Sequence, residues 1–351
     1  MPDRFVLVLA GGRGERFWPW SRPDRPKQLL PLARGGRSLL AATLERAVAL
    51  AAPERIVVLT ALDLAAAVAR ECPRGVRVIG ESVPRNTAPA IAAAARLFAA
   101  EAGDPAFAVL PADHAIDDGA AFAADLALGF ERAEREPVLL TFGIPPRGPE
   151  TSFGYVRRGA RLADRLFRVA AFTEKPDLAR AQAWVASGEC LWNSGIFVWR
   201  CTTLLDALEA SRPALAAPLR GLAWQGGDRG FERALAAVFP PLESISIDFA
   251  VLERAPNALM LEAAFDWDDL GSWRAWARRQ ERDPRGNVVF GEALALECDR
   301  CVVVGDGGLA AAIGLQDMVV VHAEGNTLAC RLDDGEGVRR VSEALRSRAA
   351  R

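Results

Sequence analysis

The chain has 351 residues, of which 51% are hydrophobic and 25% charged. This composition is typical of a folded protein with a large core and excludes a disordered one. The net charge of −2 argues against nucleic acid as a partner, and the apolar runs are too short for a membrane helix. Six scattered cysteines favour reduced thiols, so we expect a cytoplasmic protein.

The first 170 residues predict alternating strands and helices. Short apolar runs, typical of buried strands, lie at 5–10, 56–60, 76–80, 107–110 and 138–142. Alanine-rich helical stretches lie between them at 38–51, 62–71, 88–102 and 120–135. We therefore expect an α/β fold with a Rossmann-like, doubly wound mixed sheet, whose ligands bind at the carboxyl ends of the strands.

The rest of the chain is less regular. Further strands are predicted at 153–157, 166–173 and 195–200, and helices at 177–187, 202–210 and 230–238. Short β-like pieces follow at 288–290, 301–304, 309–313, 318–322 and 327–331, before a helix at 336–348. We expect a catalytic domain over 1–285 and a small β-rich, partial β-helix-like domain over 286–351. This tail either packs on the catalytic domain or mediates a homodimer.

Only two of the 43 basic residues are lysines, Lys27 and Lys175. An ammonium is compact whereas a guanidinium is a planar fork, so these two positions are expected to resist exchange for arginine. Lys27 follows a loop with the pattern Gly-Gly-x-Gly, whose backbone can approach phosphate oxygens. The loop is not a P-loop, because the pattern GxxxxGK[ST] is absent, and it is not a dinucleotide fingerprint, because Phe17 stands where a third glycine belongs. An ordinary tight turn is the alternative.

Eight motifs in order carry a family resemblance. They are GGxGxR with WPxSRxxxPKQ (11–28), ESVPRNTAPA (81–90), PADH (111–114), FGY (153–155), FTEKP (172–176), WNSGIF (192–197), SIDFA (246–250) and WDDLGSW (267–273). Together they resemble the sugar-1-phosphate nucleotidylyltransferases, specifically the bacterial mannose-1-phosphate guanylyltransferases. Phe249 departs from the family's usual tyrosine. The resemblance covers about residues 5–275.

This resemblance implies roles for single residues. The nucleotide would be bound by Leu9, Ala10, Gly11, Gly12, Gly14, Arg16, Lys27, Asn86 and Thr87. The sugar phosphate would be bound by Gly154, Glu174, Lys175 and Asn193. Mg²⁺ would be held by Asp113 and Asp269, with Asp268 as the alternative to Asp269. Arg16, Lys27, Asp113 and Lys175 would be the catalytic residues.

Plainer interpretations of these residues remain open. Asp113 and Asn193 are also typical turn residues, and Asn86 and Thr87 can cap a helix. The acidic run 266–269 can be a solvated loop, and Glu174 with Lys175 an ordinary charge pair. The reaction implied is GMP transfer from GTP to α-D-mannose 1-phosphate, giving GDP-mannose and pyrophosphate. The alternative is a relative that uses another base or another sugar, such as glucose 1-phosphate.

Overall fold

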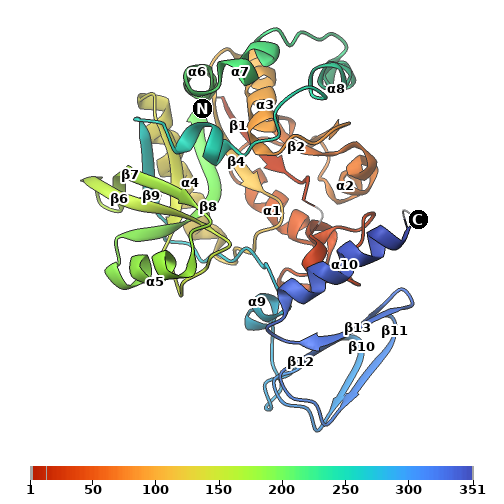
Figure 1. Ribbon diagram of the computed structural model, residues 1–351. Helices are drawn as coiled ribbons and strands as arrows, with labels where there is room; N and C mark the ends of the chain where they lie inside the picture. Colours follow the sequence, from red (N-terminus) through yellow and green to blue (C-terminus); the bar gives the residue numbers. More distant parts are fainter. Residues whose placement is uncertain (1–2, 13, 350–351) are drawn as a thin grey trace. The chain divides into compact units, whose positions relative to one another are not determined.

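The computed structural model describes residues 3–12 and 14–349 (Figure 1). The chain divides into two compact units. The first unit comprises Met1–Gly11, Thr43–Ala112 and Ile116–Trp267, and the second comprises Gly12–Ala42, Asp113–Ala115 and Asp268–Arg351. The segment that starts at Gly12 and the three residues Asp113–Ala115 therefore belong to the same unit as the tail.

A mixed sheet forms the centre of the first unit. Within the described residues its strand order is β3-β2-β1-β4-β8-β5-β9-β7-β6. The strands are β1 (Arg4–Leu9), β2 (Ile56–Ala61), β3 (Arg77–Glu81), β4 (Ala106–Pro111), β5 (Leu139–Ile144), β6 (Gly154–Ala163), β7 (Leu166–Glu174), β8 (Cys190–Arg200) and β9 (Ala258–Glu262). The first four in this order are mutually parallel, and β8 runs antiparallel to β4 and β5. The predicted doubly wound mixed sheet is confirmed.

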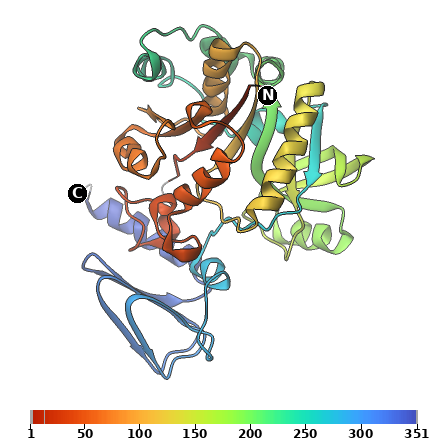
Figure 2. The ribbon, with the colours of Figure 1, turned by 180° about the vertical axis from the view of Figure 1, so that it is seen from behind.

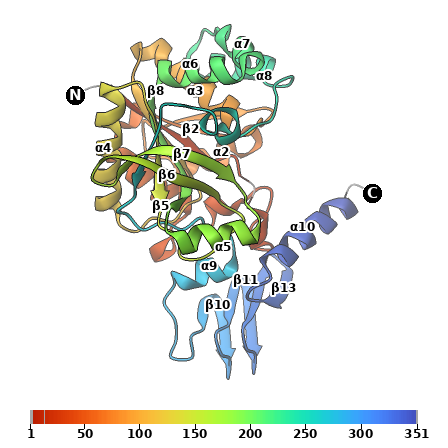
Figure 3. The ribbon, with the colours of Figure 1, turned by 60° about the vertical axis from the view of Figure 1, so that its left-hand side comes forward.

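Helices cover both faces of this sheet (Figures 2 and 3). One face packs against α3 (Thr87–Ala102), α6 (Cys201–Ser211), α7 (Pro213–Arg220) and α8 (Gly227–Val238). Side chains alternate along β8, so Phe197 and Trp199 lie in this core. Val198, between them, faces α4 (Gly119–Arg135), where a Cβ on Gly129 would meet it at 3.3 Å. Side chains on both faces of this central strand are therefore buried.

The second unit contains a four-stranded sheet in the order β10-β11-β12-β13. Its strands are β10 (Val288–Leu296), β11 (Val302–Ile313), β12 (Met318–Ala323) and β13 (Asn326–Arg331). The first three run parallel and are joined by short corners, as in a β-helix. Helices α9 (Trp273–Arg278) and α10 (Gly335–Ala349) flank it (Figure 3). The small β-rich C-terminal part is thus also confirmed.

An aromatic cluster joins the segment 12–42 to this sheet. Trp20 stacks on Trp273 at 5.9 Å between ring centroids and contacts Phe290 at 5.2 Å. The indole Nε1 of Trp20 donates a hydrogen bond of 2.8 Å to Asp306 on β11. These contacts explain why a segment near the start of the chain folds with the tail.

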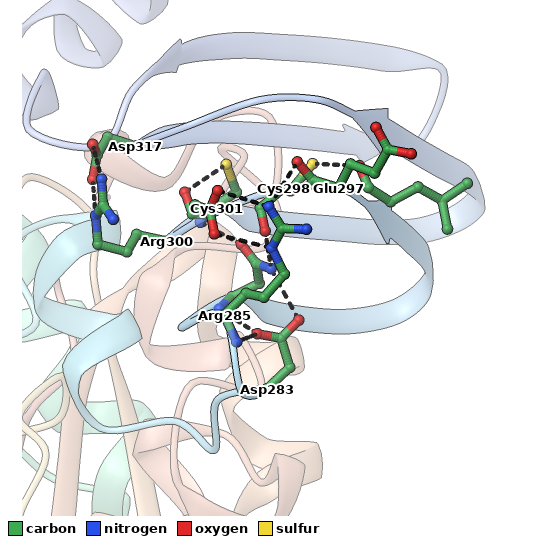
Figure 4. Close-up of polar contacts among 10 residues, drawn as sticks. Asp283, Arg285, Glu297, Cys298, Arg300, Cys301 and Asp317 are labelled. Atoms are coloured by element: carbon green, nitrogen blue, oxygen red, sulfur yellow. Dashed lines mark hydrogen bonds and ion pairs between the residues drawn. The ribbon is translucent and has the colours of Figure 1, made fainter.

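One corner of the small sheet is held by charge pairs and a buried amide (Figure 4). Arg300 pairs with Asp317 through two contacts of 2.8 Å, joining one corner to the next. Asn287 donates to the carbonyl of Cys298 at 2.7 Å and accepts from the amide of Cys301 at 2.8 Å. Among the described residues no group of three or more His, Cys, Asp or Glu side chains is arranged to hold a metal ion.

The structure corrects several expected boundaries. The pieces predicted at 301–304 and 309–313 form one strand, β11, which continues through residues 305–308 although Gly307 has a φ of +76°. Helices α7 and α9 and strand β9 were not predicted, and each of them is short. No helix in the described part of the chain is long and apolar enough to cross a membrane.

Candidate functional site

Lys27 is a buried cation of the second unit. It begins the short helix η2 (Lys27–Leu29) and is only 6% exposed. Its Nζ donates to Oδ2 of Asp113 at 2.9 Å and also to the backbone carbonyl of Asp269. A buried ammonium needs such partners, because desolvation without them is costly. Three predicted site residues, far apart in the sequence, therefore meet at one point.

Gly14 makes room for this lysine. Its φ is +58°, a left-handed conformation that favours glycine. A Cβ on Gly14 would lie 2.1 Å from the Cβ of Lys27, far closer than atoms can approach. By contrast, a Cβ on Gly12 would meet nothing within 4 Å. Gly14 is thus required by the packing, whereas Gly12 leaves backbone open to a ligand.

A cavity of about 560 Å³ opens beside Lys27 and lies entirely within the second unit. Arg16, in η1 (Glu15–Phe17), lines it, with its Nη1 beside Gly271. The full lining is Gly14, Arg16, Phe17, Lys27, Asp113, His114, Asp269, Leu270, Gly271 and Arg339. Basic groups and backbone from glycines make this cavity suited to an anion with several oxygens.

Two carboxylates of this cavity carry opposite pKa shifts. Burial alone would raise the pKa of Asp113, but the charges of Lys27 and His114 hold it below its usual range. Burial raises the pKa of Asp269 to about 6, and the charges of Asp268 and Asp113 add to the rise while Lys27 opposes it. Asp113 is therefore the carboxylate that is fully ionised at neutral pH.

Asp268 and Asp269 differ in what they face. Asp268 is 6% exposed and accepts from the amide of Leu270 at 2.9 Å and from Arg278 at 3.3 Å. Asp269 lines the cavity, and Asp268 does not. Asp269 therefore faces the cavity, whereas Asp268 is bound to its own loop and to Arg278.

The first unit presents polar groups where β1 and β3 end. Leu9 ends β1 and accepts from the amide of Ala112 at 2.9 Å, and Ala10 donates to the carbonyl of Leu59 at 2.8 Å. Gly11 follows, with no atom within 4 Å of its Cβ position. Glu81 ends β3 and is 6% exposed, yet its Oε1 accepts no hydrogen bond from any described residue. Burial raises the pKa of Glu81 to about 8, and sequence reasoning gave this residue no individual role.

Asn86 and Thr87 form the start of α3. Asn86, with φ of +65°, accepts through its side chain from the amide of Thr87 at 2.8 Å. The hydroxyl of Thr87 accepts from the amide of Ile247 at 2.8 Å. Both side chains therefore have structural partners in this unit. Asn86 caps the N-terminus of α3, which is one of the roles that the sequence left open.

A second group of predicted residues meets around the end of β7. Gly154 on β6 pairs with Glu174 on β7, and a Cβ on Gly154 would lie 2.5 Å from Glu174 Oε2. Asn193 on β8 donates through Nδ2 to Asp248 at 3.0 Å and accepts from Thr141 at 2.9 Å. The missing side chain at Gly154 is what admits the Glu174 carboxylate.

Lys175 and Asp248 complete this group. Lys175 has φ of +48° and an ion pair of 3.4 Å with Glu174, and its side chain is 65% exposed. Asp248 begins η6 (Asp248–Leu252), and burial with the nearby charge of Glu174 raises its pKa to about 7. Sequence reasoning quoted Asp248 within SIDFA but gave it no role. Its signal was an acidic residue flanked by apolar ones.

The sheet and the lysine–carboxylate cavity are features of an enzyme that acts on phosphate compounds, and the family matches define the class. Residues 5–285 match the family described as Nucleotidyl transferase, and residues 291–345 match the MannoseP isomerase/GMP-like beta-helix domain. The chain belongs to the nucleotidyl transferase family and is a nucleotidyltransferase of the sugar-1-phosphate nucleotidylyltransferase type. The resemblance drawn from the motifs is confirmed.

Particular relatives narrow the likeness. The chain is 39% identical to the xanthan biosynthesis protein XanB of Xanthomonas campestris, over 99% of this chain and 74% of that protein. It is 36% identical to a mannose-1-phosphate guanylyltransferase of Klebsiella pneumoniae, over 97% of this chain and 73% of that protein. A crystal structure titled mannose-1-phosphate geranyltransferase, from Thermus thermophilus, superposes with a TM-score of 0.87 at 38% identity, covering 98% of this chain and 99% of that one.

Proposed function

We propose that the protein transfers GMP from GTP to α-D-mannose 1-phosphate, giving GDP-mannose and pyrophosphate. A phosphate oxygen of the sugar phosphate attacks the α-phosphorus in line. The bond from that phosphorus to the bridging oxygen breaks, and pyrophosphate leaves with the electron pair. The observation that carries the proposal is Lys27, buried and held between Asp113 and the Asp269 carbonyl beside a cavity suited to phosphates. The mannose-1-phosphate guanylyltransferases among the relatives support the choice of substrates.

On the nucleotide side, the chain supplies positioning and positive charge rather than a nucleophile. Lys27 neutralises charge on the α-phosphate and on the leaving pyrophosphate, and Arg16 contacts the phosphates from the cavity wall. Backbone amides of the glycine loop bind phosphate oxygens where no Cβ intervenes. The remaining nucleotide contacts that we propose are Leu9, Ala10, Gly11, Gly12, Gly14, Asn86 and Thr87.

On the sugar side, Glu174 accepts hydrogen bonds from sugar hydroxyls, and Asn193 can both donate and accept. Lys175 binds the phosphate of the incoming sugar phosphate, since its exposed ammonium can reach beyond the strand end. Gly154 keeps space beside Glu174. We propose that Asp248 orients Asn193, because the two side chains share a hydrogen bond of 3.0 Å.

Asp113 and Asp269 fit a Mg²⁺ ion. Both are carboxylates that line the cavity, and Mg²⁺ is commonly bound by one or two carboxylates together with phosphate oxygens and waters. Lys27 contacts Asp113 through Oδ2, and Oδ1, which lies 4.0 Å from His114 Nε2, is the oxygen left to bind a cation. When bound, the ion would neutralise phosphate charge and draw the two substrates together. Lys27 then holds Asp113 in place and supplies the fixed positive charge next to it.

A substrate panel tests the proposal. Pyrophosphate release is measured with Mg²⁺ for each of the four common nucleoside triphosphates, paired with mannose 1-phosphate or glucose 1-phosphate. We expect the highest kcat/KM for GTP with mannose 1-phosphate. A higher kcat/KM for another pair would instead support the alternative, in which the enzyme uses a different base or a different sugar. No turnover with GTP and mannose 1-phosphate would refute the proposed reaction.

A further inference from the structure

The cavity beside Lys27 is lined by a cation from the other end of the chain. Arg339 lies on α10 and contributes to the same wall as Gly14, Arg16 and Lys27. We propose that Arg339 is a further phosphate-binding residue, which contacts the β- and γ-phosphates of the nucleoside triphosphate and then the pyrophosphate product. This inference rests on the proposed function of the cavity and assigns the C-terminal helix a part in substrate binding.

The packing of α10 fixes where Arg339 lies. The helix starts at Gly335, where a Cβ would lie 3.4 Å from the Cβ of Ser272. Val338 is 1% exposed and belongs to the aromatic core that also contains Phe17. The helix also lies against η1, the short helix that carries Arg16. Arg339 follows the buried Val338 directly, so its backbone is anchored at the edge of the cavity.

The described ion pairs of Arg339 lie on the exposed side of its own helix. Its Nε and Nη2 both donate to Glu336, at 2.9 and 2.5 Å, and its Nη1 lies 3.5 Å from Glu343, so a phosphate would exchange with these carboxylates. These carboxylates are 60% and 45% exposed, and the arginine side chain is 47% exposed. Ion pairs in such exposed positions contribute little, whereas a guanidinium can bind a phosphate through two parallel hydrogen bonds.

Exposure also indicates which phosphates Arg339 meets. Lys27 is buried beside the two carboxylates, where the reacting α-phosphate is proposed to lie. Arg339 is half exposed, so it faces the part of the ligand nearer to solvent. In a triphosphate with its α-phosphate at Lys27, that part is the terminal pair of phosphates. Arg16, Lys27 and Arg339 then supply three cations among the described lining residues for a ligand of high negative charge.

Binding measurements can separate this role from a general effect of charge. Arg340 is an exposed arginine on the same helix that does not line the cavity, so Arg340→Ala is the matched control. Dissociation constants for GTP, GMP and inorganic pyrophosphate are measured by calorimetry for the wild type, Arg339→Ala, Arg339→Lys and Arg340→Ala. Melting temperatures are recorded for each variant to establish that it folds.

We expect Arg339→Ala to weaken the binding of GTP and of pyrophosphate at least tenfold. The dissociation constant for GMP should change less than twofold. Arg339→Lys should fall between the wild type and Arg339→Ala, and Arg340→Ala should match the wild type for all three ligands. Unchanged pyrophosphate and GTP binding in Arg339→Ala would overturn the inference, as would an equal loss in Arg340→Ala. If the wild type binds pyrophosphate, Arg339→Ala weakens that binding, and the wild type does not bind GTP, then the proposed function is contradicted while the role of Arg339 stands.

Discussion

Replacing Lys27 by arginine keeps the positive charge and changes only its shape. Lys27 is 6% exposed, and its Nζ is shared between the Asp113 carboxylate and the Asp269 carbonyl. The neighbouring Gly14 already has no room for a Cβ beside the lysine side chain. A planar guanidinium carries more atoms and directs its donors in one plane, so it cannot occupy this space without displacing one of the two acceptors.

The expected size follows from packing. Inserting extra atoms into a well-packed site costs about 1–3 kcal/mol. If that cost falls on the transition state, turnover drops roughly 5- to 150-fold, since about 1.4 kcal/mol corresponds to a tenfold change in rate. Lys175→Arg is the natural comparison, because the side chain of Lys175 is 65% exposed and has space for a larger group. We expect its loss to be smaller than that of Lys27→Arg.

The assay is steady-state pyrophosphate release at saturating concentrations of both substrates, with thermal melting as the control for folding. If the Lys27→Arg variant retains turnover within twofold of the wild type, the argument that a guanidinium does not fit at this position is refuted. An equal loss in Lys27→Arg and Lys175→Arg would show that the shape of the cation matters at both sites, and that burial does not decide the size of the effect.

Three further predictions concern Gly14, with Gly12 as its control, Glu81 and Gly154. Gly14→Ala should lower the melting temperature, because left-handed backbone costs about 1–2 kcal/mol without glycine before the clash is counted. Gly12→Ala, which has open space, should not lower it, and equal effects would contradict this account. For Glu81, whose pKa of about 8 exceeds its ordinary 4.5, the folded state holds a proton that the unfolded state loses between these values. Wild-type stability should therefore fall as pH rises through that window. Glu81→Gln should escape the fall, and a constant difference in melting temperature from pH 5 to 9 would refute it. Gly154→Ala would place a Cβ 2.5 Å from Glu174. The KM for the sugar phosphate should therefore rise about tenfold, while the KM for GTP stays unchanged. An equal rise in both KM values would argue against a role of Gly154 in sugar binding.

Local patterns were sufficient to predict much of the fold. The apolar runs at 56–60 and 107–110 became β2 and β4, since short apolar runs between helices leave few alternatives to a buried strand. The glycines at 305–308 were a false break. A run of glycines between apolar pieces resembles a turn, but in β11 these residues form a bulge opposite Gly291, where the two backbones approach closely. Local pattern does not distinguish these two uses.

The candidate site was less accessible to sequence reasoning. Lys27 and Asp113 could be proposed because each stands in one of the ordered family motifs, and Asp113 also lies just after the strand β4. Arg339 could not, because it is one of many arginines on an amphipathic helix, and only tertiary packing brings that helix to η1. Glu81 shows the complementary limit. Its motif was evident in the sequence. Only the folded chain shows that its Oε1 is buried without a hydrogen-bond partner among the described residues.

The two lysines of the chain are constrained by different physical features. At Lys27 the ammonium is enclosed, and the absent Cβ of Gly14 and the acceptors on either side fit a single small cation. At Lys175 the side chain is exposed, and the unusual feature is instead the backbone, whose φ of +48° turns the chain at the end of β7. A left-handed residue is costly unless its surroundings require it. This turn follows Glu174 directly and precedes the helix α5 (Leu178–Ser187), so it fixes where the ammonium starts relative to that carboxylate. Lysine at 27 is therefore constrained by the volume of its head group, whereas lysine at 175 is constrained by where the backbone presents it.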